Sequence, residues 1–291
     1  MSMLHLSRGE LLAVYRLRDW KHKVNMVRAL LYVVLAYAMA GALWAWPMGC
    51  ALVMFLLFLM YGGVWNDYWD WSLEGQRNAL GTLVHDGALS RRQSLWLTVL
   101  PLPVVIVLSV LTSTMAVEPA VGSIFVVLIV LVTVYASPPV RFKVRVPWGF
   151  FAAPTVTTLM FLAAWGVVSP WRRLTVAMAL SLFLFHCYAE CLHVLDDAAI
   201  PGETRKLPVA AARRWAEWLP VLSVAYTGVL AWTWPMFTAG VLGGLIRWRT
   251  VRSTGADQVQ LHRHRTRLWS PLLCLPEFCV YGVAGLLKLA R

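Results

Sequence analysis

An amide and three carboxylates fall within nine positions of one stretch, YGGVWNDYWDWSLEGQR at residues 61–77. Asn66, Asp70 and Glu74 recur at every fourth position. Asp67 lies three residues before Asp70, so a helix places all four side chains on one broad face. The preceding run is apolar, and a charge at membrane depth costs at least about 2.5–3.5 kcal/mol unless something cationic binds it. Oxygen ligands of this kind suit Mg²⁺ with phosphate oxygens, the alternative being a polar helix end among the lipid headgroups.

A second polar cluster ends a later apolar run, in HCYAECLHVLDDAAIPGETRKLPV at residues 186–209. Its acidic and imidazole side chains on or beside one helix face are Glu190, His193, Asp196 and Asp197, and two cations follow, Arg205 and Lys206. A proton relay that begins at His186 is the competing interpretation of this row. Because both clusters end apolar runs on the same predicted side of the membrane, they indicate two halves of one site.

A third stretch, YASPPVRFKVRVPWG at residues 135–149, follows another apolar run. Its two consecutive prolines stop a helix and stiffen the turn, and Arg141, Lys143 and Arg145 follow at alternate positions. A rigid loop that presents cations beside a metal-binding acid cluster suits a diphosphate. Ordinary cytoplasmic-loop charge stays open as the alternative, above all for Arg145.

The elements that must position these side chains are apolar helices. The chain has 291 residues, of which 59% are hydrophobic and 14% charged, and its mean hydropathy is +0.65. These values are typical of an integral membrane protein. No run alternates as a β-strand would, which predicts an all-α bundle in a single domain over residues 1–291. We count about nine apolar runs as transmembrane helices, at residues 29–47, 49–65, 95–112, 120–136, 149–168, 174–192, 216–233, 235–246 and 269–289.

The net charge of +12 is explained by membrane topology better than by nucleic acid. If the N-terminus is cytoplasmic, 22 of the 26 Lys and Arg residues lie on the cytoplasmic side, as the positive-inside rule predicts. Residues 1–28 form a basic, amphipathic arm without a small-residue cleavage site, so we expect no cleaved signal peptide. The arm is expected to lie on anionic headgroups, the sharper alternative being delivery of Lys23 or Arg28 to a bound anion. We expect the inner membrane of a bacterial cell, with the site on the cytoplasmic face.

Some residues have structural interpretations. Ser90 and Gln93 form the pattern of a capping box at the start of the third run. His85 is expected to be a solvated residue in a polar loop. The five cysteines all lie in apolar runs and are expected to be reduced and buried.

Three motifs together resemble the UbiA-type intramembrane prenyltransferases. NDYWDWSLE is similar to the first aspartate-rich motif of that family: Asn66, Asp67 and Asp70 match it, and Glu74 stands at its last Asp. YASPPVRFK resembles the loop of the family between its fourth and fifth spans, through Tyr135, the prolines, Arg141 and Lys143. LDDAAIPGETRKLPV is similar to the second acidic motif and its Leu-Pro-Val tail. The resemblance covers nearly the whole chain in the right order.

The resemblance implies a nine-helix bundle around a central cavity open to lipid, with Mg²⁺ bridging both acidic motifs to an isoprenyl diphosphate. It implies transfer of the prenyl group to a lipophilic or aromatic acceptor in the bilayer. The implied metal ligands are Asn66, Asp67, Asp70, Glu74, Asp196 and Asp197. The implied catalytic residues are Asp67, Asp70, Asp197 and Lys143. The implied substrate contacts are Asn66, Arg77, Tyr135, Arg141, Lys143, Glu190, His193, Arg205 and Lys206.

The chain departs from the family pattern in two places. His193 stands where the first Asp of the second motif would be if Asp197 is the second; otherwise Asp196 and Asp197 are the ligands, with Glu190 assisting. Near residues 82–84 an expected Arg-Pro-Leu is replaced by Thr-Leu-Val, and Arg77 or Arg91 is the substitute cation.

Three alternative functions remain beside prenyl transfer. A terpene cyclase of the same fold would use Glu190 and His193 as a terminal base. A transferase for another group, such as phosphoribose, has little support in the sequence. A proton-coupled transporter would be built on the His and Glu row.

Overall fold

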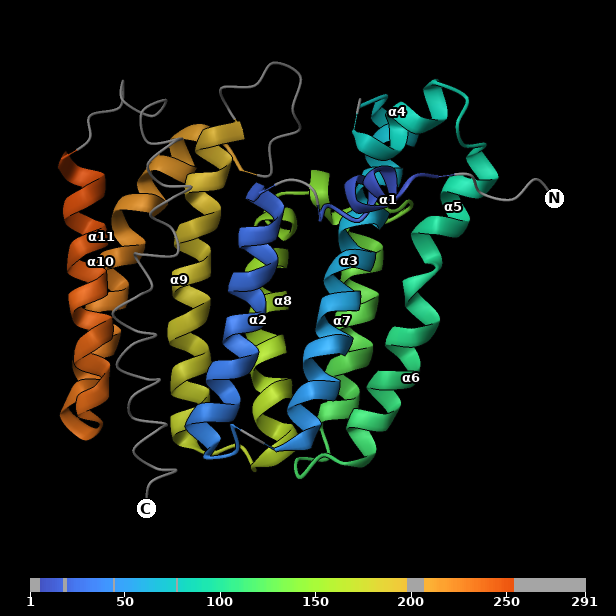
Figure 1. The fold of residues 1–291 in the computed structure, drawn as a ribbon. Coiled ribbons are helices and arrows are strands. Elements are labelled where there is room, and N and C mark those ends of the chain that lie inside the picture. Colours follow the sequence, from blue (N-terminus) through green and yellow to red (C-terminus); the bar gives the residue numbers. More distant parts are fainter. Residues whose placement is uncertain (1–5, 18–19, 44, 77, 198–206, 254–291) are drawn as a thin grey trace.

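The computed structural model describes residues 6–17, 20–43, 45–76, 78–197 and 207–253, and the side chains of residues 20–25, 28, 196, 197 and 253 fall outside that description. The described residues form α-helices and two short 3₁₀ turns, and none of them is in a strand (Figure 1). The helices are α1 (Arg8–Val14), α2 (Trp20–Ala40), α3 (Trp46–Glu74), α4 (Ala79–His85), α5 (Arg91–Val99), α6 (Pro101–Thr114), α7 (Val121–Ala136), α8 (Trp148–Val168), α9 (Arg173–Asp197), α10 (Val209–Thr233) and α11 (Thr238–Ser253). The 3₁₀ turns are η1 (Phe142–Val144) and η2 (Pro235–Phe237).

The all-α prediction is confirmed for this part of the chain. Eight of the predicted apolar runs overlap α2, α3, α5 with α6, and α7 to α11, while the run at residues 269–289 lies outside the described residues. Four helical stretches within the description are long and apolar enough to cross a bilayer: Trp46–Glu74, Arg91–Thr114, Trp148–Val168 and Arg173–Leu195. Ala29–Ala40 and Val121–Ala136 are shorter apolar helices.

The helices stand roughly parallel in a bundle (Figure 1). α2, α3, α7, α8 and α9 enclose the main hydrophobic core, while α10 and α11 pack on the α9 side and α6 packs on α3. A smaller apolar cluster at one end joins Val14, Val64, Tyr68, Leu80 and Leu97, from α1, α3, α4 and α5. The carboxyl ends of α3 and α9 and the η1 turn lie at this same end of the bundle. The fold therefore brings the three sequence motifs to one end.

Local sequence explains where several helices begin and end. The predicted capping box is confirmed at α5: the Ser90 hydroxyl accepts from the Gln93 amide at 3.2 Å, and Gln93 Oε1 accepts from the Ser90 amide at 2.8 Å. α3 ends at Gly75, which has a left-handed backbone at φ 66°.

The sequence predicted a polar loop after α3, but the structure has a short helix there. This helix is α4, which begins because the Asn78 side chain accepts from the Gly81 amide at 2.8 Å. A Cβ on Gly81 would lie 2.6 Å from Trp71, so a glycine is what allows α4 to rest against α3. His85, at the end of α4, is exposed as expected.

Candidate active site

The acidic stretch is helical, as predicted, because α3 continues through Glu74. We call Asn66, Asp67, Asp70 and Glu74 the acid row. Asn66 Nδ2 donates to Asp70 Oδ2 at 2.7 Å, which is the contact expected of helix neighbours four residues apart. Asp67 and Asp70 are only 7% and 5% exposed. Carboxylates this buried require compensation by cations.

Each carboxylate of the acid row is paired with a cation from elsewhere in the chain. Lys143 Nζ lies 2.6 Å from Asp70 Oδ1. Arg141 Nη2 donates to Glu74 Oε1. Arg16 binds Asp67 through two parallel bonds, Nε to Oδ2 at 2.8 Å and Nη2 to Oδ1. Three carboxylates thus face three cations, which balances the local charge.

Arg141 and Lys143 reach the acid row from the loop after α7, as the sequence indicated. α7 is tied to α3 through Thr133, whose hydroxyl lies 2.8 Å from the Tyr61 hydroxyl and whose carbonyl accepts from Trp65 Nε1 at 2.8 Å. Beyond α7 the Arg141 amide donates to the Ser137 carbonyl at 2.9 Å.

Two features hold the far side of this loop. Arg145 Nη2 donates to the Pro139 carbonyl at 2.9 Å, so this cation closes the loop and does not contact the acid row. A Cβ on Gly149, at the start of α8, would lie 2.7 Å from the carbonyl oxygens of Phe142 and Lys143. The glycine therefore permits η1 to sit directly on α8, which fixes the position of Lys143.

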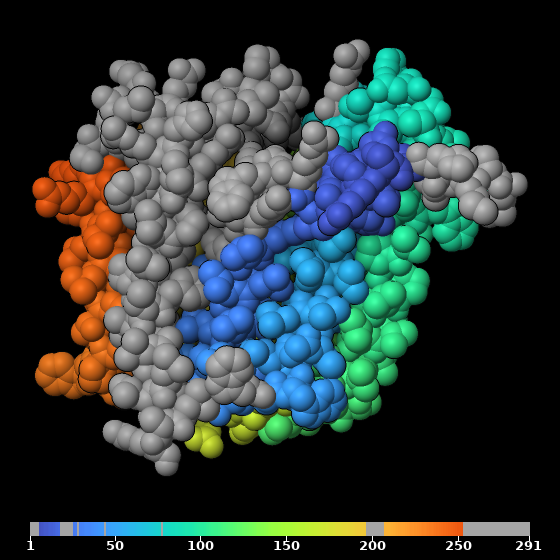
Figure 2. All heavy atoms as spheres, in the orientation of Figure 1, coloured from blue at the N-terminus to red at the C-terminus, as the bar shows by residue number. Residues whose placement is uncertain are grey.

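Arg16 was not among the predicted site residues. It follows α1, whose Val14 is buried in the apolar cluster at this end of the bundle, and the Tyr15 hydroxyl donates to the Leu97 carbonyl at 3.0 Å. Figure 2 shows α1 lying across the bundle end against α4. From the sequence, Lys23 or Arg28 was the cation that the N-terminal arm would bring to a bound anion. The side chains of both lie outside the described residues. A contact between residues 51 positions apart leaves no local signal in the sequence.

The acid row has the donor set of a Mg²⁺ site, namely carboxylate oxygens and one amide oxygen. Asn66 Oδ1 is buried and accepts no hydrogen bond from the described part of the chain. Arg141 Nε is likewise a buried donor without a partner among the described residues. An acceptor that faces a metal and a donor that faces an anion would both be left open in this way. No three His, Cys, Asp or Glu side chains converge on one point within the described ranges.

The second polar cluster lies on α9, as the sequence predicted. His186 and Glu190 are buried, and the His186 ring meets Tyr32 of α2 edge-on at 4.9 Å. His193 is half-buried, as is Tyr135 at the end of α7. The side chains of Asp196 and Asp197 lie outside the description, together with residues 77, 205 and 206.

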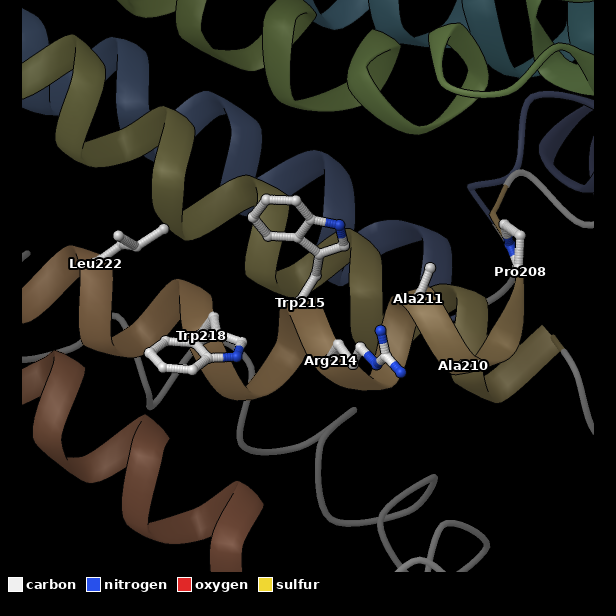
Figure 3. A pocket seen from close by; sticks show the side chains of 7 residues that line it. All are labelled: Pro208, Ala210, Ala211, Arg214, Trp215, Trp218 and Leu222. Carbon is white, nitrogen blue, oxygen red and sulfur yellow. The ribbon is translucent and has the colours of Figure 1, made fainter.

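A separate open groove of about 730 Å³ runs along α10 (Figure 3). Its lining residues are Pro208, Ala210, Ala211, Arg214, Trp215, Trp218 and Leu222. This groove offers no carboxylate, and none of its residues belongs to the acid row or to the loop that faces it.

Fold and site together define a class of protein. It is an integral membrane protein made of a helical bundle, and one end of the bundle carries a row of buried carboxylates that are paired with cations. The model of the UbiA prenyltransferase family matches residues 28–270. The chain belongs to the UbiA prenyltransferase family. No curated protein matches the sequence.

Solved structures share the fold at low sequence identity. A UbiA homolog from Archaeoglobus fulgidus bound to DMAPP and Mg²⁺ gives a TM-score of 0.73 at 11% identity, covering 97% of this chain and 99% of the homolog. The homolog bound to GPP and Mg²⁺ gives 0.68 at 13% identity, covering 97% and 100%. A structure of digeranylgeranylglyceryl phosphate synthase gives 0.67 at 14% identity, covering 95% and 97%.

Proposed function

We propose that the chain transfers a prenyl group from an isoprenyl diphosphate to a lipophilic or aromatic acceptor in the membrane, with Mg²⁺ as cofactor. The observation that carries the proposal is the meeting of Arg141 and Lys143 with the carboxylates of α3. Family membership supports it, and so do the structural neighbours bound to Mg²⁺ with GPP or DMAPP.

In this proposal the acid row holds one Mg²⁺, and Asp196 with Asp197 holds another. When bound, Mg²⁺ supplies positive charge that stabilises the diphosphate as it leaves. Asn66 Oδ1 suits a metal ligand because it is a buried acceptor that receives no hydrogen bond from the described residues. Glu190 and His193 precede Asp197 on one face of α9 and are proposed to contact the substrate.

The cations of the chain bind the departing diphosphate. Lys143 and Arg141 sit beside the acid row, and burial strengthens their attraction for an anion because little water screens it. Arg141 Nε offers a further donor. The remaining proposed diphosphate and substrate contacts are Arg77, Tyr135, Arg205 and Lys206. Apolar walls then exclude water, so that the acceptor captures the allylic cation.

The wider setting belongs to the same proposal. We infer about nine membrane helices around a central cavity that opens to lipid, in the inner membrane of a bacterium. The skewed distribution of Lys and Arg supports a cytoplasmic active site and N-terminus.

The test uses purified protein in lipid nanodiscs with labelled isoprenyl diphosphates of several chain lengths and a panel of quinol-type and phenolic acceptors. We expect pyrophosphate release and a prenylated acceptor with Mg²⁺, and neither after EDTA is added. Asp70→Asn should abolish both products. An absence of turnover across the whole panel would contradict the proposal.

A cyclase is the second candidate, because Glu190 and His186 are buried on α9 and could accept a proton from a cyclised cation. Omitting the acceptor separates the two functions. A cyclase releases a terpene hydrocarbon or alcohol together with pyrophosphate, whereas a transferase releases little of either.

A further inference from the structure

Arg16 occupies both carboxylate oxygens of Asp67. Its Nε binds Oδ2 at 2.8 Å and its Nη2 binds Oδ1. A metal ion bound by Asp67 needs at least one of these oxygens, and it would then lie beside a guanidinium of like charge. The observed pair therefore disfavours a metal ion at Asp67, because two cations would share one carboxylate.

The backbone of Arg16 has a left-handed conformation, which is strained for arginine and favours glycine. The Leu17 amide donates to the Leu12 carbonyl at 2.7 Å, and the Arg16 amide donates to the Ala13 carbonyl at 3.0 Å. These two bonds form a Schellman motif, in which the position of Arg16 is usually glycine because its φ is positive, here 57°. Among the described residues, the non-glycine residues with positive φ are Arg16 and Arg141, and both bind the acid row. Strain of this kind concentrates at functional sites.

The chain is built to hold this arginine beside α3. α1 begins with a capping box between Ser7 and Glu10 and is anchored through the Tyr15 hydroxyl. A Cβ on Gly63, one turn before Asp67, would lie 3.2 Å from Arg16 Cδ, so the glycine makes room for the side chain. The Arg16 side chain keeps 25% of its surface exposed, more than Lys143 or Arg141 does in the other two pairs.

We propose, on the basis of the function proposed above, that Arg16 is a displaceable counterion of Asp67. It neutralises Asp67 before substrate binds, and it moves to the diphosphate when the metal takes the carboxylate. Metal alone would break the paired bonds between Arg16 and Asp67 and give nothing in return. Metal with diphosphate would offer Arg16 an anion in exchange for Asp67. Arg16 therefore makes binding of metal and binding of diphosphate depend on each other.

The test measures binding, not turnover. Mn²⁺ binding is followed by electron paramagnetic resonance on the full chain in nanodiscs, with and without inorganic pyrophosphate. We expect Arg16→Gly to bind Mn²⁺ alone about tenfold more tightly than the unaltered protein, a coupling of ordinary size. We also expect pyrophosphate to strengthen Mn²⁺ binding less in Arg16→Gly than in the unaltered protein. Glycine suits the backbone at this position, and thermal unfolding of the metal-free and metal-loaded variant verifies that it folds.

Two further variants act as controls. Arg8→Gln removes an exposed positive charge from α1, the helix that precedes Arg16, and should leave Mn²⁺ binding unchanged. Arg16→Lys keeps the charge without the paired bonds and should fall between the unaltered protein and Arg16→Gly. The role of Arg16 would be overturned if Arg16→Gly and the unaltered protein had equal affinities for Mn²⁺. It would also be overturned if Arg8→Gln changed the affinity as much as Arg16→Gly does. Either result would leave the proposed function standing. If the unaltered protein bound no Mn²⁺ even with pyrophosphate, the proposed function would fail as well.

Discussion

Lys143 and Asp70 form the most buried of the three ion pairs on the acid row, with side chains 11% and 7% exposed. A pair at this depth does not by itself show a gain in stability, because removing two charges from water offsets most of their attraction. Losing one partner is different, since the other charge then stays buried without compensation. The three ion pairs therefore neutralise the buried carboxylates of the acid row.

We predict that Lys143→Met destabilises the protein by about 3 kcal/mol, because Asp70 loses its buried partner. The measurement is the midpoint of thermal unfolding in detergent. Adding Asp70→Asn to Lys143→Met should restore most of the loss, because the pair is then uncharged. Both variants should lack prenyl transfer. An unchanged midpoint in Lys143→Met would show that Asp70 is compensated by some other group.

At the scale of elements, the contact between η1 and α8 decides where the two loop cations point. Gly149 permits that contact because two carbonyl oxygens lie only 2.7 Å from where a Cβ would be. Gly49 in α3 is a matched control, since no atom lies within 4 Å of its Cβ position.

We predict that Gly149→Ala costs about 1–3 kcal/mol, the usual range for overpacking. It should also lower activity by more than this loss of stability accounts for, because η1 must move Lys143 away from Asp70. The measurements are unfolding midpoints and prenyl transfer at a temperature where both variants are folded. Gly49→Ala should match the unaltered protein in both, and a loss of activity there would show that the assay reports general fragility.

The start of α1 is the second element with a testable consequence. Hydrogen bonds from the Ser7 side chain and the Ser7 amide lower the pKa of Glu10 from its ordinary value of 4.5. Because that pKa is lower in the folded protein, ionised Glu10 stabilises the folded start of α1. This stabilisation is complete above about pH 4.5 and is lost as the pH falls through the lowered pKa.

We therefore predict that the α1 amides exchange hydrogen faster below pH 4.5, after correction for the intrinsic effect of pH. Glu10→Gln should remove this dependence, because an amide in the same capping box does not titrate. If Glu10→Gln keeps the full pH dependence, another group near α1 is responsible.

At the scale of the whole molecule, the proposed orientation follows from charge. The α4–α5 turn and the turn before α9 lie at opposite ends of the bundle (Figure 1). Asp86 and Arg172 are exposed residues in these two turns.

We predict that Asp86→Cys reacts with a membrane-impermeant maleimide only from the cytoplasmic side and that Arg172→Cys reacts only from the opposite side. The measurement is labelling of intact cells against inverted vesicles, in a background without the five native cysteines. The reverse pattern would place the acid row on the outer face and contradict the proposed orientation.

Much of the fold was predictable because it depends on local periodicity. The stretch from Trp46 to Glu74 is one helix because an almost continuous apolar run leads into the acid row, whose residues recur at helical spacing. The Ser90 capping box needs only residues that are neighbours in sequence. α4 was missed although Asn78 is a local N-cap signal, because a helix of only seven residues depends on packing, here of Gly81 against Trp71 of α3.

By itself the sequence determined a membrane protein of apolar helices with an acid row and a cation-bearing loop, as the described residues have it. Helix period, hydropathy and proline placement are properties of adjacent residues, and they act before the chain packs. Only the tertiary structure decided which cation meets which carboxylate. Lys143 reaches Asp70 because Gly149 lets η1 rest on α8, and Arg16 reaches Asp67 because α1 docks beside α3. These pairings join residues far apart in the chain, so packing, and not spacing, selects them.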